Sequence, residues 1–548
     1  MTIEATARTV REATLDLLRD LGLTTIFSNP SHTEMKLFED WPSAGFRFIT
    51  GLQEATVVGM ADGHAQATDT PSLVVINGGP GLGNAMGSVY TAASSHTPMV
   101  ILGGQQARKL LQGEPFLHAR DATQLPQPYI KWAAEAARPQ DVPALLLKAY
   151  NIANQVPKGP VYVAVPEDDW GRPASTVPLP ARAVVPAVVP DPAVLAEVAA
   201  KLSGARNLGI VAGPTIDTQG ARHDLISLAE KLNATVHGSP VWPRSSFPEN
   251  HPLFAGVLPP IPEMISAKLA DHDVVAVFGS PMFTLFTTAD IFPTTPVEPD
   301  LTPQPQLPEN VEFLHFTDDP EAASWAMAGT SYVLPPGQTV RDLVPLVRAR
   351  EQAPPTRPVY EVPRASSPLT QAYLFHLLAQ ELPADAAVFE ELPIARADFH
   401  EQLPLGVDNN YFATASGALG FPFAGAVGFA LAAPDRRVVA VTGEGSAQYT
   451  IHALWTAAQH DLPVTFVIPN NAGYLSLKYY LQEQDRETWQ AGWDLSGVDM
   501  AGLARGFGCP AERVETPEQL QKALKTAFAT PGPVLLDVVV ADPGLFRL

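Results

Sequence analysis

The stretch 437–471, RVVAVTGEGSAQYTIHALWTAAQHDLPVTFVIPNN, carries a strand pattern, a helix pattern and a second strand pattern in that order. Residues 437–442 and 464–468 are apolar and rich in β-branched side chains, whereas residues 451–458 favour a helix. In a βαβ unit the carboxyl ends of the two strands meet at one edge of a parallel sheet. The sequence therefore predicts that Glu444 and Asn471, which follow the two strands, lie close together.

The residues around Glu444 suit an anion and a hard cation. Gly443 and Gly445 would let the backbone approach phosphate oxygens, and Ser446 is expected to open a helix whose amino end favours negative charge. Carboxylate and amide oxygens are typical magnesium ligands. A glycine-flanked acid alone is an ordinary turn. The ordered strands and the following Asn470-Asn471 favour a metal and diphosphate site over that simpler interpretation.

Length and proline distribution predict three domains. A chain of 548 residues is too long for one core. Two proline-rich passages, residues 177–192 and 354–368, are typical of extended linkers. Strand and helix patterns alternate in each third, which predicts three open parallel α/β sheets, in domains at 1–180, 190–350 and 366–548.

Composition excludes several classes of protein. The net charge of −22 argues against a nucleic-acid partner. The longest apolar runs are too short to cross a bilayer, and the first residues lack the basic start and apolar core of a signal peptide. Cys509 is the only cysteine, which excludes an internal disulfide and fits a reducing compartment. We expect a cytoplasmic protein without a membrane partner.

Several motifs in this order resemble the decarboxylase branch of the thiamine-diphosphate enzymes, and within it the benzoylformate decarboxylases. The matching stretches are Phe27-Ser28-Asn29-Pro30, residues 52–63, 83–87, 159–162, 167–170 and 453–459, together with the Gly443 to Ser446 turn. The resemblance implies a pyrimidine-binding, a middle and a diphosphate-binding domain. It also implies thiamine diphosphate and Mg²⁺ as cofactors. Glu444 departs from the family pattern, which normally has aspartate there.

The resemblance assigns roles to matching residues. Glu54 would hydrogen-bond the pyrimidine ring in a largely dry cleft and promote removal of the proton from the thiazolium carbon. A solvated residue at a helix start is the alternative for Glu54. Leu419 would lie beneath the two rings, and the Gly417 carbonyl would accept from the amino group. The implied cofactor-binding residues are Asn29, Pro30, Gly417, Leu419, Gly445, Ser446 and Tyr474, and the implied metal ligands are Glu444, Asn471 and Gly473.

The substrate pocket departs from the family pattern. Benzoylformate decarboxylases place a serine and two histidines around the reacting carbon, and this chain has His32, Asn77 and Phe286 at the matching positions. His32 is a candidate acid or base, because imidazole titrates near neutrality, or else an ordinary turn residue. The expected pocket residues are Asn77, Phe116, Leu117, Phe286, Leu477 and Tyr480, of which the five other than Asn77 could equally be plain core residues.

The implied activity is non-oxidative decarboxylation of an aryl or branched 2-keto acid to an aldehyde. A carboligase or carbon-carbon lyase with the same cofactor, acting on a 2-keto acid or an aldehyde, remains an alternative, as does a non-catalytic cofactor-binding relative. In this family the cofactor lies between the Glu54-bearing domain of one chain and the Glu444-bearing domain of another. The resemblance therefore implies a homo-oligomer, at least a dimer and expected to be a dimer of dimers.

Overall fold

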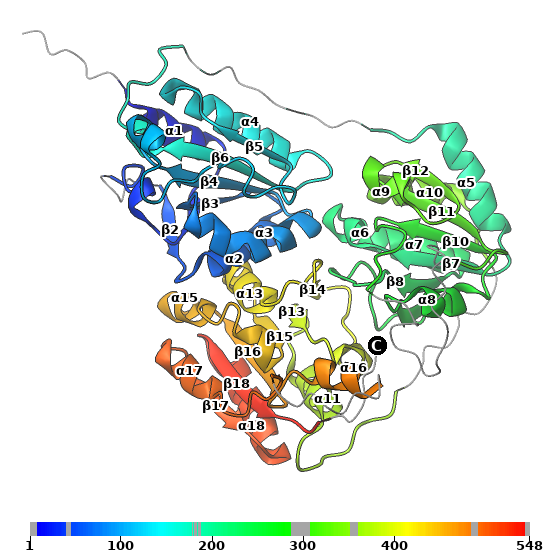
Figure 1. The fold of residues 1–548 in the computed structure, drawn as a ribbon. Helices are drawn as coiled ribbons and strands as arrows, with labels where there is room; N and C mark the ends of the chain where they lie inside the picture. Colours follow the sequence, from blue (N-terminus) through cyan, green and yellow to red (C-terminus); the bar gives the residue numbers. More distant parts are fainter. Residues whose placement is uncertain are drawn as a thin grey trace, which may run out of the picture.

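The protein consists of three α/β lobes, each built on a six-stranded parallel sheet (Figure 1). The structure, a computed structural model, describes residues 8–39, 45–177, 179, 184, 188–286, 307–350, 360–483 and 492–542, and the side chains of 480–483 are not described. Of the two predicted linkers, residues 178, 180–183, 185–187 and 354–359 lie outside this description, and the described residues 360–368 form no helix or strand. In each sheet the strand order reverses near the centre, which is the open, doubly wound arrangement.

The first lobe has strand order β2-β1-β3-β4-β6-β5. Its strands are β1 (Thr25–Ser28), β2 (Arg47–Thr50), β3 (Ser72–Asn77), β4 (Met99–Gln105), β5 (Trp132–Glu135) and β6 (Pro160–Pro166). Its helices are α1 (Val10–Asp20), α2 (Glu54–Thr68), α3 (Pro80–Ser94) and α4 (Val142–Asn154), with short 3₁₀ turns η1 (His32–Glu34), η2 (Arg108–Gly113), η3 (Pro139–Asp141) and η4 (Glu167–Asp169). The central strands β3, β4 and β6 are buried throughout, as expected for strands covered by helices on both faces.

The middle lobe has strand order β12-β11-β10-β7-β8-β9. Its strands are β7 (Leu208–Ala212), β8 (Thr235–Gly238), β9 (Phe254–Val257), β10 (Val274–Phe278), β11 (Glu312–Thr317) and β12 (Thr330–Val333). Its helices are α5 (Pro192–Gly204), α6 (Pro214–Thr218), α7 (Arg222–Leu232), α8 (Pro262–Leu269), α9 (Pro320–Ser324) and α10 (Pro336–Leu346). The apolar runs at 208–213 and 274–279, which predicted a third sheet, form the neighbouring central strands β7 and β10.

The third lobe has strand order β14-β13-β15-β16-β18-β17. Its strands are β13 (Ala387–Glu391), β14 (Asn410–Ala413), β15 (Val438–Thr442), β16 (Val464–Asn470), β17 (Ala511–Val514) and β18 (Val534–Val539). Its helices are α11 (Gln371–Glu381), α12 (Arg396–Gln402), α13 (Phe421–Ala432), α14 (Glu444–Ala447), α15 (Ala453–Gln459), α16 (Leu475–Glu483), α17 (Met500–Gly506) and α18 (Pro517–Ala529).

The predicted βαβ unit is confirmed, because β15 and β16 are parallel neighbours. The expected helix start at Ser446 is wrong. The helical turn α14 begins two residues earlier, at Glu444, and ends at Ala447, and the next helix, α15, starts only at Ala453. Gly443 is extended and caps this turn, which places Glu444 itself at the amino end of the helix.

The first and third lobes share a core where α2 packs against α13 (Figure 1). Small residues on both helices bring the two backbones into contact. A Cβ atom on Gly63 would lie 1.9 Å from the carbonyl oxygen of Gly425, and one on Gly428 would lie 1.8 Å from that of Met60. This contact fixes α2, whose first residue is Glu54, relative to the loop that leads into α13.

Candidate active site

The structure brings Glu444, Asn471 and Gly473 together at the carboxyl edge of the third sheet. The amide nitrogen of Gly473 lies 2.7 Å from Oε1 of Glu444 and 3.2 Å from Oδ1 of Asn471. Two oxygen atoms that accept from the same N–H group necessarily lie close to each other. Ala472, between these residues, has φ of 62°, a left-handed backbone conformation that is uncommon for non-glycine residues.

The carboxylate of Glu444 is 3% exposed, and burial raises its pKa, with the nearby Asp537 adding to the rise. A cation bound to Glu444 would offset this cost. Asp537 itself accepts from Asn470 Nδ2 at 2.8 Å, and Oδ1 of Asn470 accepts from the Ala472 amide at 3.0 Å. This chain of bonds fixes the loop that carries Asn471, as outer residues do at metal sites.

The Gly443 to Ser446 turn lines a small cavity of about 60 Å³. A Cβ atom on Gly445 would lie 2.3 Å from the ring of Tyr474, so only glycine allows this approach. Oε1 of Gln371, a buried residue in the cavity wall, has no hydrogen-bond partner among the described residues. A glycine turn, a helix start and a buried acid together fit a diphosphate with its metal ion.

The loop that carries Gly417 and Leu419 lies between the first lobe and this turn. Ser416 Oγ is 2.8 Å from Thr91 Oγ1 on α3, and Leu419 is half-buried. The next residue, Gly420, donates its amide hydrogen to the carboxyl group of Glu391 at the end of β13. The loop is therefore held from both lobes.

Glu54 lies at the carboxyl edge of the first sheet, as the first residue of α2. Its carboxylate accepts hydrogen bonds from two side-chain amides, Asn29 Nδ2 to Oε1 and Asn84 Nδ2 to Oε2, both at 3.1 Å. Glu54 is half-buried within one chain rather than enclosed in the expected dry cleft. Its two oxygens point in fixed directions because each has its own donor.

Asn77 lies beside Glu54 and is bound by protein groups at both ends of its amide. Its Nδ2 donates to Thr33 Oγ1 at 2.9 Å and its Oδ1 accepts from the Gly79 amide at 3.0 Å. Thr33 in turn donates to Oε1 of the fully buried Glu34 at 2.5 Å, and burial raises the pKa of that acid. Asn77 is 3% exposed, so it supports the wall of the site more than it presents an open amide.

His32 lies on η1 with 74% of its side chain exposed, and its Nε2 is 3.4 Å from Oε2 of Glu167. The expected apolar side chains are also open to solvent within a single chain: Phe116 is 87% exposed, Phe286 69% and Leu477 50%. Leu117 has φ of 64° and is partly buried. None of these side chains lines the cavity beside Glu444, and that of Tyr480 lies outside the described atoms.

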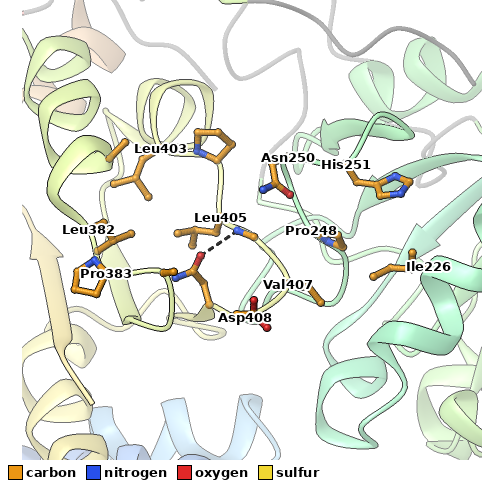
Figure 2. Close-up of a pocket in the computed structure, with 15 residues that line it drawn as sticks. Ile226, Pro248, Asn250, His251, Leu382, Pro383, Leu403, Leu405, Val407 and Asp408 are labelled. Atoms are coloured by element: carbon orange, nitrogen blue, oxygen red, sulfur yellow. Dashed lines mark hydrogen bonds between the residues drawn. The ribbon is translucent and has the colours of Figure 1, made fainter. Parts of the chain in front are cut away.

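A larger cavity of about 470 Å³ lies between the middle and third lobes (Figure 2). Ile226, Asn250 and His251 face Leu382 and Leu403 across it. Its wall contains none of the residues expected to bind cofactor, metal or substrate. The chemistry of the Glu444 edge, rather than cavity size, therefore identifies the candidate active site.

Comparison with known proteins agrees with this geometry. The sequence matches the N-terminal thiamine pyrophosphate (TPP) binding domain of the thiamine pyrophosphate enzymes over residues 8–127, their central domain over 195–341, and their C-terminal TPP binding domain over 398–538. The chain belongs to the thiamine pyrophosphate enzyme family. Thiamine pyrophosphate and thiamine diphosphate are the same molecule, so the predicted family and fold are confirmed.

Individual members of the thiamine pyrophosphate enzymes match the chain along its whole length. A benzoylformate decarboxylase of Pseudomonas aeruginosa is 38% identical over 543 residues, covering 97% of this chain and 98% of that protein. The structure of a thiamine diphosphate-dependent 4-hydroxybenzoylformate decarboxylase of Rhodococcus jostii RHA1 superposes with a TM-score of 0.91 at 36% identity, covering 97% and 99% of the two chains. The structure of a benzoylformate decarboxylase from Polynucleobacter necessarius superposes with a TM-score of 0.90 at 33% identity. The match covers 97% of this chain and 99% of that chain.

No helix among the described residues is both long and apolar enough to cross a bilayer. Within the same residues, no three histidine, cysteine or acidic side chains gather as a metal site. The predicted metal set contains one carboxylate, one amide and one carbonyl, and therefore does not depend on such a cluster.

Two residues of the site were missed by sequence reasoning. Asn84 lies near the start of α3, in the 83–87 stretch that resembles the family, but the resemblance assigned no role to its side chain. Glu391 ends a strand next to β15, at the same sheet edge as Glu444. The position of strand ends in a parallel sheet could have indicated Glu391, whereas the contact of Asn84 with Glu54 depends on tertiary packing.

Proposed function

We propose that the protein decarboxylates an aryl or branched 2-keto acid of the benzoylformate type to the corresponding aldehyde. The observation that carries this proposal is the likeness to benzoylformate decarboxylases along the whole chain, in sequence and in structure. The polar residues on both sheet edges support it, because they would supply the two halves of one cofactor site.

Thiamine diphosphate, when bound, supplies the electron sink for the departing carboxylate. Glu54 would hold the pyrimidine end, with Asn29 and Asn84 fixing its two oxygens. Gly417 and Leu419 would support the two rings, and Gly445, Ser446 and Tyr474 would line the diphosphate end. Pro30, next to Asn29, would shape the entrance to the pyrimidine side.

Mg²⁺ would be held by the carboxylate of Glu444, Oδ1 of Asn471 and the carbonyl of Gly473. Their convergence around the Gly473 amide supports this set. Glu444 is one methylene longer than the usual aspartate, and it already reaches across the loop to Gly473. The extra length is therefore absorbed within the loop.

His32 is the proposed acid or base for the reacting carbon, and Asn77 the support for that wall. Phe116, Leu117, Phe286, Leu477 and Tyr480 would enclose the side chain of the substrate. The exposure of Phe116, Phe286 and Leu477 in one chain supports closure of the pocket by a second copy.

The oligomer follows from the same reasoning. Every residue that lines the cavity beside Glu444 lies between 371 and 476, so Glu54 is not among them. A complete site requires the Glu54 edge of another copy, and we propose a homodimer that pairs into a tetramer. The single cysteine and the negative charge support a cytoplasmic location without a nucleic-acid partner.

Product analysis tests the proposed function. The protein, loaded with thiamine diphosphate and MgCl₂, is incubated with benzoylformate, with and without an acceptor aldehyde. Benzaldehyde and carbon dioxide without acceptor would support the decarboxylase, whereas a 2-hydroxy ketone as the main product would support a carboligase. Absence of any product while the cofactor is bound would contradict the proposed substrate class.

A further inference from the structure

Glu391, the last residue of β13, connects two separate turns of the site. Its Oε1 and Oε2 accept from the Gly420 amide at 2.9 and 3.2 Å, and its carboxyl group is hydrogen-bonded to the hydroxyl of Ser446. Its main-chain carbonyl accepts from Thr442 Oγ1 at 3.3 Å and from the Gly443 amide at 3.4 Å. One residue therefore braces the glycine turn and the loop before α13.

The contact with Gly420 controls the backbone next to Leu419. Gly420 has φ of 102°, a conformation that favours glycine, and a Cβ atom there would lie 2.6 Å from Cβ of Tyr449. The amide of Gly420 thus has little freedom to turn away from Glu391. The bond holds Leu419 and Ser446 at a fixed separation.

The carboxyl group of Glu391 is buried, and burial raises its pKa to about 7. The charged groups on the neighbouring elements are Glu390 on β13 and Glu444 on α14. Glu390 adds to the rise, although its Oε2 accepts from Tyr411 and faces the positive charge of Arg396 on α12, and its Oε1 accepts from the Leu392 amide. Glu444 turns toward Gly473. Glu391 therefore changes protonation close to neutral pH.

The protonation of Glu391 decides what Ser446 can do. A serine hydroxyl has one hydrogen to donate. If Glu391 is ionised it can only accept, and it draws the Ser446 hydrogen toward itself. If Glu391 is neutral, its O–H can donate to Ser446 Oγ, and the serine hydrogen is free to point at an anion.

We propose that Glu391 is a positioning residue for the diphosphate. When thiamine diphosphate binds, Glu391 takes up one proton from solvent, donates a hydrogen bond to Ser446 Oγ, and so directs the Ser446 hydrogen at a diphosphate oxygen. Its other oxygen keeps the bond from Gly420. This inference rests on the proposed cofactor site and adds a role for a residue outside the glycine turn.

The variant Glu391→Gln tests the proton directly. A glutamine can accept from Gly420 and donate to Ser446, as the neutral acid does, but it does not titrate. The dissociation constant for thiamine diphosphate is measured at saturating MgCl₂ from pH 6 to 8.5. At pH 6 both proteins should bind alike, and at pH 8.5 the wild type should bind ~10-fold more weakly than Glu391→Gln.

Titration of the cofactor's own phosphate is common to both proteins and cancels in this comparison. Calorimetry at pH 8 in two buffers of different ionisation enthalpy should show the wild type taking up about one proton more than Glu391→Gln. The variant Glu391→Ala, checked for folding by its thermal unfolding midpoint, should bind weakly at every pH. If Glu391→Ala does not fold, Glu391→Gln alone decides.

Identical pH dependence in the wild type and Glu391→Gln would overturn the inference, as would tight binding by a folded Glu391→Ala. If either of these contradicting results occurs while the wild type turns over benzoylformate, the proposed role of Glu391 is wrong but the proposed function stands. If the wild type binds no thiamine diphosphate, the proposed cofactor site falls with it.

Discussion

The amide nitrogen of Gly473 lies 2.7 Å from Oε1 of Glu444, so the acid of the glycine turn supports the opposite loop as well as facing the proposed metal site. Glu444→Gln separates these two roles, because the amide oxygen of glutamine can still accept from Gly473 while the negative charge is lost. We expect the dissociation constant for Mg²⁺, measured by cofactor binding at varied MgCl₂, to rise at least by the ~10–100-fold typical of outer-shell losses. Glu444→Asp, the family's usual residue, is the matched control and should keep the Mg²⁺ requirement. Equal Mg²⁺ dependence in wild type and Glu444→Gln would exclude Glu444 as a ligand.

Asn84 should influence Glu54, the carboxylate that is proposed to activate the cofactor. Asn84→Asp places a second carboxylate 3.1 Å from Oε2 of Glu54, where the amide now donates. Two carboxylates this close repel each other, so the charged form of Glu54 should be less favourable in the variant than in the wild type. The acid limb of the pH profile of kcat/KM for benzoylformate should then move to higher pH, with Asn84→Ala as the uncharged control. An unmoved acid limb would show that Glu54 does not govern this limb.

Contact between α2 and α13 should make small residues indispensable there. Gly63→Ala and Gly428→Ala place a methyl group within 2 Å of a backbone carbonyl, so each should destabilise the protein by roughly 1–3 kcal/mol or more. Gly204→Ala, at the exposed end of α5, has nothing within 4 Å and is the matched control. Thermal unfolding midpoints of the three variants measure the difference. Equal midpoints would mean that the two helices are not in such close contact.

Asp62 should make stability depend on pH. It is buried in α2, its Oδ1 accepts from Gln66 and Thr97, and its Oδ2 has no partner among the described residues. Burial raises its pKa to about 6 from an ordinary value of 3.8. Between pH 3.8 and about 6 the folded state therefore binds more protons than the unfolded state. The free energy of unfolding falls by ~3 kcal/mol as the pH rises through this range.

Asp62→Asn keeps the acceptor at Oδ1 and does not titrate. Its unfolding midpoint should exceed that of the wild type at pH 8, and the difference should shrink towards pH 4. A difference that stays constant over this range would contradict a buried acid that must ionise.

The sequence predicted the parts of the fold that depend on local pattern. Strands such as β15 and β16 are apolar runs in the sequence and were placed correctly. The start of α14 was missed by two residues, because Ser446 is a common capping residue and its position after Gly445 suggested a cap. The preference of serine for a capping position did not decide where the helix begins. Gly445 packs directly against the ring of Tyr474, and this contact places it inside the helical turn.

Contacts between distant segments could not be predicted from pattern. The donors to Glu54 come from residues 25 positions before it and 30 positions after it, and nothing local indicates that their amides converge. The substrate pocket was the part of the site that was hardest to predict from the sequence. Phe116 and Phe286 are exposed in one chain, and no local strand or helix pattern indicates what would cover them.

The central claim is that Glu54 activates a bound cofactor, and the variant Glu54→Gln tests it most directly. Thiamine diphosphate binding and benzoylformate turnover are measured on the same sample, so that the rate is expressed per occupied site. We predict that the variant still binds the cofactor, while its turnover falls by the ~10²–10⁴-fold that a positioned acid or base contributes. Turnover per occupied site close to that of the wild type would contradict the account.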